Sequence, residues 1–458
     1  MRVVIVSYAF PPVGGAGVQR MLKLAKYLPS AGVTPTILSV DNASVPLRDE
    51  TLSSDIPAAV EVIRARTLEP GYAAKQRAWS AAADGRRSAR SAVIGIAKRL
   101  LVPDPQVLWL PAASRALARR LRAAHDDVVL VSGPPFSQFA LAPIARHFGA
   151  AVVLDYRDEW TTLSGGIYEM AGASRSASAA LESLLLRSQD AITTATAAFR
   201  DGLLARFSFL SPERVVAIEN GYDPADFPQE LPTPPDDRLV VTYVGTVFRL
   251  TRAAGLLAAV RQVHARHPEL AARLEVRFVG RIVDTEAPFF DGVPGVVRTG
   301  YVDHSEAVME QARCHLALCL LADVPGAERI YPAKIFETMA LRKPCLALCP
   351  TGALAKLVKA HRVGDVIHPD DVSAIARFLV ERLVAHENGT LQTESAPIDV
   401  ERFDRRRQAR AFAEVMDLAR ENCRNRARPR TGRVSSAWTT SRRWAHHYRS
   451  PGRSSPRP

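Results

Sequence analysis

Residues 3–40 read VVIVSYAFPPVGGAGVQRMLKLAKYLPSAGVTPTILSV, and this stretch decides the fold class. It opens with a short β-branched run at 3–7 and passes through a loop rich in Pro and Gly. Residues 18–28 then carry apolar side chains at helical spacing, and 34–40 has the composition of a second strand. Strand, glycine loop, helix and strand in this order predict a βαβ unit with a buried parallel sheet, and therefore an α/β protein.

The same alternation of apolar runs and helical patterns continues along the chain. A stretch at 224–238 with five Pro and four acidic residues interrupts it, and the alternation then restarts at residue 240. We therefore expect an N-terminal domain at 1–223, a linker at 224–238 and a C-terminal domain at 239–423. Residues 424–458 are rich in Ser, Pro and Arg, which predicts a disordered basic tail.

The positive charge of the chain is concentrated in this tail. The formal net charge is +13, and residues 424–458 hold ten Arg and no Asp or Glu. The first 423 residues therefore carry only +3. We do not expect nucleic-acid binding by the body of the protein, because the basic surface that it needs is missing. Binding of nucleic acid by the tail alone stays open as a side activity.

Several features predict a cytoplasmic protein. The five Cys form no CxxC pair, no apolar run reaches the length of a membrane span, and the N-terminus lacks the pattern of a signal peptide. Residues 86–101 mix Arg and Lys with apolar residues at helical spacing. They are either a solvated surface helix or a basic amphipathic segment in peripheral contact with the anionic inner face of the plasma membrane.

Two motifs follow the pattern of anion-binding loops. Gly14, Gly15 and Gly17 lie between the first strand and the first helix, without the spacing of a dinucleotide or Walker motif. They form either a tight turn or a ligand loop. Residues 332–337 read PAKIFE and predict the start of a helix with Pro at its first position, where Lys334 would face an anion. The carboxylate of Glu337 either binds a vicinal diol or only stabilises the helix dipole.

A third motif lies at a strand end. Residues 155–160 read DYRDEW, and ligands of open α/β sheets bind at the carboxyl ends of strands. Asp158 could orient a hydroxyl or take its proton, or the motif could hold a structural pair with Arg157. No DxD motif is present, so we expect no catalytic metal. Arg249, Arg252 and Arg281 are candidates for binding a pyrophosphate, with an exposed, solvated Arg as the alternative for each.

In their order and spacing these motifs resemble glycosyltransferase family 4. The resemblance covers residues 1 to about 420. It is carried by FPPVGGAGVQR at 10–20, VSGPPFS at 131–137, DYRDEW at 155–160, IENGYD at 218–223, GYVDHSE at 300–306 and YPAKIFETMA at 331–340.

The resemblance implies a GT-B fold, in which two Rossmann-like domains face each other across a cleft. It leaves open whether the last helix packs back on the N-terminal domain. It also implies a retaining, metal-independent transferase of the hexosyltransferase type, without a cofactor, because the nucleotide diphosphate-sugar is a substrate. The acceptor would be a saccharide or a lipid-linked molecule, in the synthesis of cell-surface polysaccharide or glycolipid.

Site roles carry over position by position. By resemblance Glu337 would hold the ribose diol, Lys334 would lie beside the pyrophosphate, and Arg249 or Arg252 would be the phosphate clamp. Asp158 would be the catalytic carboxylate that faces the acceptor. The remaining donor-side positions are Tyr301 and Val302 against the base, and Gly14, Gly15 and Gly17 at the boundary between donor and acceptor.

One position departs from the family pattern. The family has two Glu separated by seven residues, and the position that pairs with Glu337 is Arg329, with Glu328 one residue away. Because the missing Glu normally contacts the donor sugar, the identity of that sugar stays open. Two alternatives therefore remain: a non-catalytic nucleotide-sugar-binding scaffold, and a nucleotide-sugar epimerase on the same fold.

Overall fold

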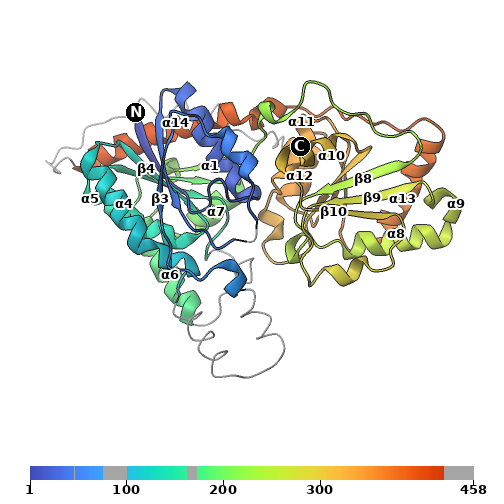
Figure 1. The fold of residues 1–458 in the computed structure, drawn as a ribbon, viewed down its shortest axis with the longest axis horizontal. Helices are drawn as coiled ribbons and strands as arrows, with labels where there is room; N and C mark the ends of the chain where they lie inside the picture. The colour runs from blue at the N-terminus through green and yellow to red at the C-terminus, as the bar shows by residue number, and fades with distance from the viewer. Residues whose placement is uncertain (46, 76–100, 162–172, 428–458) are drawn as a thin grey trace, which may run out of the picture. The chain divides into compact units, whose positions relative to one another are not determined.

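The computed structural model describes residues 1–45, 47–75, 101–161 and 173–427 (Figure 1). Two sheets organise this part of the chain, and all neighbouring strands in both sheets are parallel. The first sheet has the order β3-β2-β1-β4-β5-β6-β7. Its strands are β1 Arg2–Val6, β2 Thr34–Val40, β3 Glu61–Ala65, β4 Val128–Gly133, β5 Ala151–Tyr156, β6 Ala191–Thr194 and β7 Val215–Ala217.

Helices cover both faces of the first sheet, as an all-parallel sheet requires. Because side chains alternate along a strand, Val3 and Ile5 pack on one face while Val4 and Val6 pack on the other. The Val4 face is covered by α4 Leu110–Ala123, α5 Ala142–His147, α6 Ala173–Leu186 and α7 Ala197–Arg206. The Val3 face is covered by α1 Ala16–Tyr27 and by the last helix, α14 Arg405–Ala427.

The second sheet has the order β10-β9-β8-β11-β12-β13. Its strands are β8 Leu239–Val244, β9 Leu274–Val279, β10 Val296–Gly300, β11 Leu316–Leu320, β12 Cys345–Leu348 and β13 Gly364–Ile367. One face packs on α8 Ala254–Arg266 and α13 Val372–Glu387, and the other packs on α11 Lys334–Ala340 and α12 Ala353–Ala360. The short α9 Pro268–Ala271 follows α8, and α10 His304–Ala312 follows β10.

The chain passes from one sheet to the other twice, first between β7 and β8 and again between α13 and α14. These two crossings are joined by hydrogen bonds. Tyr222 and Asp404 form a parallel bridge, in which Tyr222 N donates to Phe403 O and Arg405 N donates to Tyr222 O, both at 3.0 Å. A Cβ at Gly221 would lie 1.9 Å from the oxygen of Phe403, so this close approach requires glycine. The bridge fixes the start of α14, whose Phe412 and Met416 then pack in the core of the first sheet.

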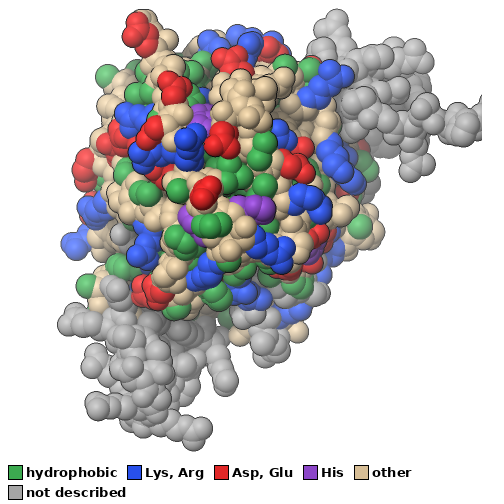
Figure 2. Space-filling model, turned by 90° about the vertical axis from the view of Figure 1, so that its right-hand side faces the viewer, with side chains coloured by type: hydrophobic (Ala, Val, Ile, Leu, Met, Phe, Trp, Pro, Cys, Tyr) green, Lys and Arg blue, Asp and Glu red, His purple; other side chains and the backbone are tan. Residues whose placement is uncertain are grey.

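Residues 1–423 form one compact unit that contains both sheets. Figure 2 shows basic and acidic side chains interspersed on the visible face, without a broad field of one sign, as the small net charge of this part of the chain predicts. The segment 86–101, except for its last residue, and the tail from residue 428 lie outside the described residues. Residues 424–427, which were predicted to belong to the disordered tail, are instead the last residues of α14. No helix within the described ranges is long and apolar enough to cross a membrane.

Several details of the predicted elements differ from the structure. The strands β3, β10 and β13 were not predicted, since all three are exposed or partly exposed edge strands without a continuous apolar run. The helices α4 and α12 were not predicted either. The first helix begins at Ala16 instead of residue 18, so Gly17 lies in its first turn and not in the loop before it. The helix predicted to begin at Pro332 begins at Lys334 instead, with Ala333 as its N-cap residue.

Candidate functional site

A cavity of about 150 Å³ opens at the carboxyl ends of β8 and β9, the edge at which open α/β sheets bind ligands. Residues of the first sheet's domain, of both crossings and of the second sheet's domain line it. The lining includes Gly15, Gln19, Leu47, Asp49, Gly221, Gly245, Thr246, Gly280, Arg281, Tyr301, Val302, His304, Lys334, Glu337 and Arg405.

Glycines at two strand ends shape the floor of the cavity. Gly245 follows β8 and Gly280 follows β9, with φ angles of 150° and 132°. A Cβ at Gly280 would lie 2.3 Å from the oxygen of Gly245, so the two loops can pack backbone to backbone only with glycine there. Both glycines line the cavity together with Arg281 and Lys334.

The PAKIFE motif supplies the charged part of the lining. Lys334 and Glu337 lie one turn apart on α11, and the Lys334 ammonium donates to Glu337 Oε2 at 2.7 Å. Both side chains are largely buried. The structure thus places the two residues predicted for the donor side in one cavity, as a polar pair that can exchange its internal contact for contacts to a ligand.

The glycine loop faces Tyr301 from the other domain. A Cβ at Gly14 would come within 3.0 Å of the Tyr301 hydroxyl oxygen, and Gly15 lines the cavity. The Tyr301 hydroxyl donates to Asp49 Oδ2 at 3.1 Å. Burial, reinforced by the charge of Asp49, raises the pKa of Tyr301 to about 12, so the phenol stays protonated at neutral pH.

Gly14, Gly17 and the residues of the DYRDEW motif are not among the residues that line this cavity. The oxygen of Gly17 accepts a hydrogen bond from Arg157, which also donates to the oxygen of Pro134. Asp155 is fully buried and paired with Arg20 at 2.9 Å, so its carboxylate is structural. Asp158 follows β5 in a half-buried turn and is not among the lining residues.

Of the three arginines that the sequence offered for a diphosphate, only Arg281 lines the cavity. Arg249 is exposed, in a short 3₁₀ helix, η7 Arg249–Thr251. Arg252 is half exposed, and its Nε lies 3.4 Å from Glu286 Oε1. The end of β9 is therefore better placed than the loop after β8 to deliver a guanidinium group to a ligand in this cavity.

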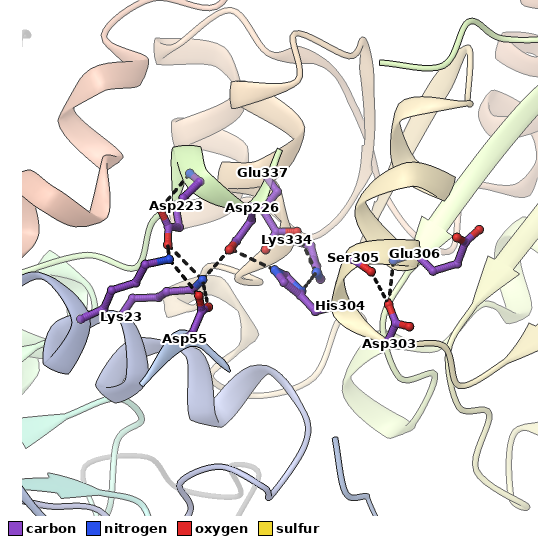
Figure 3. A network of polar contacts seen from close by, with 12 residues as sticks. Lys23, Asp55, Asp223, Asp226, Asp303, His304, Ser305, Glu306, Lys334 and Glu337 are labelled. Atoms are coloured by element: carbon purple, nitrogen blue, oxygen red, sulfur yellow. Dashed lines mark hydrogen bonds and ion pairs between the residues drawn. The ribbon is translucent and has the colours of Figure 1, made fainter. Parts of the chain in front are cut away.

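Among the lining residues that the sequence did not single out, His304 and Arg405 can carry positive charge. His304, the first residue of α10, lies 3.0 Å from Asp226 and 3.5 Å from Lys334 through its two ring nitrogens (Figure 3). It stands inside the quoted motif GYVDHSE, which was the available signal. Arg405 is buried at the start of α14, donates to Gln408 at 3.1 Å and forms no ion pair with a described residue. No sequence pattern distinguishes it from its neighbours Arg406 and Arg407.

Arg329, at the position of the expected second Glu, does not line the cavity. Its Nη2 donates to Glu159 Oε1 at 2.6 Å and to the oxygen of Ala198 at 2.7 Å. The side chain therefore contacts the first sheet's domain instead of the space where a donor sugar would lie.

Several solved structures share the fold of this chain. WaaG, a glycosyltransferase involved in lipopolysaccharide biosynthesis, is 13% identical with a TM-score of 0.54, covering 92% of this chain and 98% of its own. A mutant of TarM from S. aureus, in complex with fondaparinux, α-GlcNAc-glycerol and UDP, is 10% identical with a TM-score of 0.56, covering 92% and 96%. A protein assigned as UDP-N-acetylglucosamine 2-epimerase from Listeria monocytogenes is 11% identical with a TM-score of 0.54, covering 92% and 96%.

These similarities and the two parallel sheets confirm the predicted GT-B architecture. Two family models also match the sequence: the glycosyl transferase 4-like domain at residues 14–221, and glycosyl transferases group 1 at residues 238–384. The chain belongs to the family 4 type of glycosyltransferases. A search of curated proteins found no match.

Proposed function

We propose that this transferase moves a sugar from a nucleotide diphosphate-sugar to a hydroxyl group, with retention of configuration at the anomeric carbon. The observation that carries the proposal is the pair Lys334–Glu337 in a cavity at the carboxyl ends of the second sheet. An ammonium group for a phosphate and a carboxylate for a diol are there within one helical turn, opposite the glycine loop of the other domain.

Each part of the donor has a proposed partner. The carboxylate of Glu337 accepts hydrogen bonds from the ribose hydroxyls, and the base lies against Tyr301 and Val302. Lys334 and Arg281 neutralise the diphosphate and stabilise the charge that develops on it as the glycosidic bond breaks. Since these cations supply the electrostatic stabilisation, the proposal needs neither a catalytic metal nor a cofactor.

The acceptor enters from the side of the first sheet. Asp158 stands at the carboxyl end of β5 and would orient the acceptor hydroxyl toward the anomeric carbon. Two of the similar structures belong to a glycosyltransferase of lipopolysaccharide biosynthesis and to a protein bound to a GlcNAc-glycerol. They support an acceptor in cell-surface polysaccharide or glycolipid synthesis, reached from the cytoplasmic face of the membrane.

Thermal unfolding with a panel of nucleoside diphosphates and nucleotide sugars tests the donor site. We expect the ligands that carry one particular base to raise the melting temperature of the protein, because a ligand that binds only the folded state stabilises it. Glu337→Ala should abolish the shift. Glu306→Ala, which removes an exposed carboxylate on α10, is the matched control and should keep it. Equal shifts in all three proteins would contradict the role of Glu337.

The two alternatives differ from transfer in what they do with the bound nucleotide sugar. An epimerase, a fold neighbour of this chain, needs no acceptor and would change the configuration of the sugar on the nucleotide. A binding scaffold, suggested by Arg329, would leave the nucleotide sugar intact with every acceptor. Release of nucleoside diphosphate that depends on an added acceptor would support transfer against both.

A further inference from the structure

The imidazole ring of His304 is held between a carboxylate and an ammonium group inside the candidate donor cavity (Figure 3). Its Nε2 lies 3.0 Å from Asp226 Oδ2, and its Nδ1 lies 3.5 Å from the nitrogen of Lys334. The side chain is only 15% exposed. The assigned roles of Glu337, Lys334 and Arg281 leave this ring unexplained.

Asp226 determines which ring nitrogen carries the proton. It ends the short 3₁₀ helix η6 Pro224–Asp226 and also pairs with the buried Lys23 of α1. Burial alone would raise the pKa of Asp226, but its contacts with His304 and Lys23 hold that pKa below the ordinary value. An ionised carboxylate can only accept a hydrogen bond, so Nε2–H donates to Asp226. The second nitrogen, Nδ1, is then turned toward Lys334.

The protonation state of Nδ1 determines how a phosphate can bind beside Lys334. In a neutral ring Nδ1 carries a lone pair, which accepts from the ammonium group but repels an anionic oxygen. A protonated ring presents an N–H there and becomes a second cation beside Lys334. The charged groups around the ring are Asp226, Lys23, Lys334, Glu337, the preceding Asp303 and Arg405.

We propose that His304 takes up a proton from solvent when the donor diphosphate binds beside Lys334, and that its Nδ1–H then donates to a diphosphate oxygen. The inference rests on the proposed function and extends it, since it makes binding of the diphosphate depend on pH. The departing nucleoside diphosphate carries one more negative charge than it does in the donor. The imidazolium therefore stabilises the leaving group more than the substrate.

Calorimetric titration tests the proton uptake directly. The ligands are inorganic pyrophosphate and UDP, GDP and ADP, titrated at about pH 6 and about pH 8, the range in which an imidazole changes charge. At each pH two buffers with different ionisation enthalpies report the number of protons taken up. We expect wild-type protein to take up a proton at the higher pH and to bind about 10-fold more tightly at the lower pH.

Three variants separate the imidazole from other causes. His304→Gln should abolish the proton uptake that is due to the imidazole. Proton uptake by the ligand itself is the same for every variant and serves as the background. Asp226→Asn keeps an acceptor for Nε2–H but removes the charge, so the uptake should move to lower pH. His368→Gln is the control, because His368 also pairs with a carboxylate, Asp323 at 3.3 Å, but is exposed and outside the cavity lining.

The outcomes distinguish this inference from the proposed function. Equal proton uptake in wild type and His304→Gln, with equal affinities, overturns the role of His304 alone. A wild-type protein that binds none of the four ligands at either pH contradicts the proposed function and the inference together. Loss of uptake in His304→Gln together with the shift in Asp226→Asn supports the inference.

Discussion

The guanidinium group of Arg329 donates to Glu159 at 2.6 Å and joins the loop before α11 to the segment that follows β5. The Glu159 side chain is 1% exposed and that of Arg329 is 25% exposed, so the pair is largely withdrawn from water. Thr196 adds a hydrogen bond from its hydroxyl to the oxygen of Arg329 at 3.1 Å. At the position where the resemblance led us to expect a Glu, this chain has an Arg that links its two domains.

Removing one member of this pair should destabilise the protein. Arg329→Gln or Glu159→Gln removes one member of this largely buried ion pair, which typically costs about 3 kcal/mol of unfolding free energy. The double variant should lose less than the sum of the two single variants. Urea unfolding of all four proteins measures the coupling, and strictly additive losses would show that the pair contributes nothing.

Replacing Gly202 with alanine should destabilise the protein, which is the opposite of the usual effect in a helix. Within a helix, Gly→Ala ordinarily stabilises by about 1 kcal/mol. In α7, however, a Cβ at Gly202 would lie 2.0 Å from Arg329 Nη2 and 2.9 Å from Glu159 Oε1. We expect Gly202→Ala to lower the melting temperature of the wild type and to raise it in an Arg329→Ala background. The same sign in both backgrounds would contradict this steric account.

Glu182 should make stability depend on pH. Burial raises the pKa of this carboxyl from 4.5 to about 7, although Tyr156 and Thr161 donate to it. Because the folded state holds the proton more tightly, this stabilisation is complete below about pH 4.5 and is lost as pH rises through about 7. The loss amounts to about 3 kcal/mol. Glu182→Gln cannot ionise, so its unfolding free energy should not show this loss with rising pH. Denaturation of both proteins at low and high pH checks the sign of the effect.

Arg405 should contribute to diphosphate affinity. Burial lowers the pKa of Arg405 to about 10, so the guanidinium group stays charged at neutral pH beside the cavity. Arg405→Gln should weaken binding of a nucleoside diphosphate by about 10-fold and leave binding of the nucleoside unchanged. Arg407→Gln, on an exposed residue of the same helix, is the control. Equal losses for nucleoside and diphosphate would mean that the substitution only disturbs the crossing.

Those parts of the fold and the site that depend on residues close together in the sequence could be predicted from it. The strand at 34–40 is found with the predicted bounds, because its side chains are almost all buried. Lys334 and Glu337 meet in the cavity because they stand one turn apart on a single helix. The edge strand β3 was missed, since partial exposure leaves it without a clear apolar run.

What the sequence could not supply were contacts between distant segments. His304, Asp226 and Lys23 come from three elements of both domains, and nothing in their local spacing brings them together. A local pattern also cannot tell which of several arginines turns inward. Arg281 lines the cavity, whereas Arg252 lies beside Glu286 and does not.

The most direct test of the central claim asks whether Glu337 holds the ribose hydroxyls of the donor. Dissociation constants would be measured for the nucleoside diphosphate that binds best and for its 2′-deoxy and 3′-deoxy forms, with wild type and Glu337→Gln. We expect a loss of affinity of about 10-fold or more on removing a hydroxyl from the wild-type complex, and little further loss in the variant. The same loss in both proteins, or none in the wild type, would contradict it.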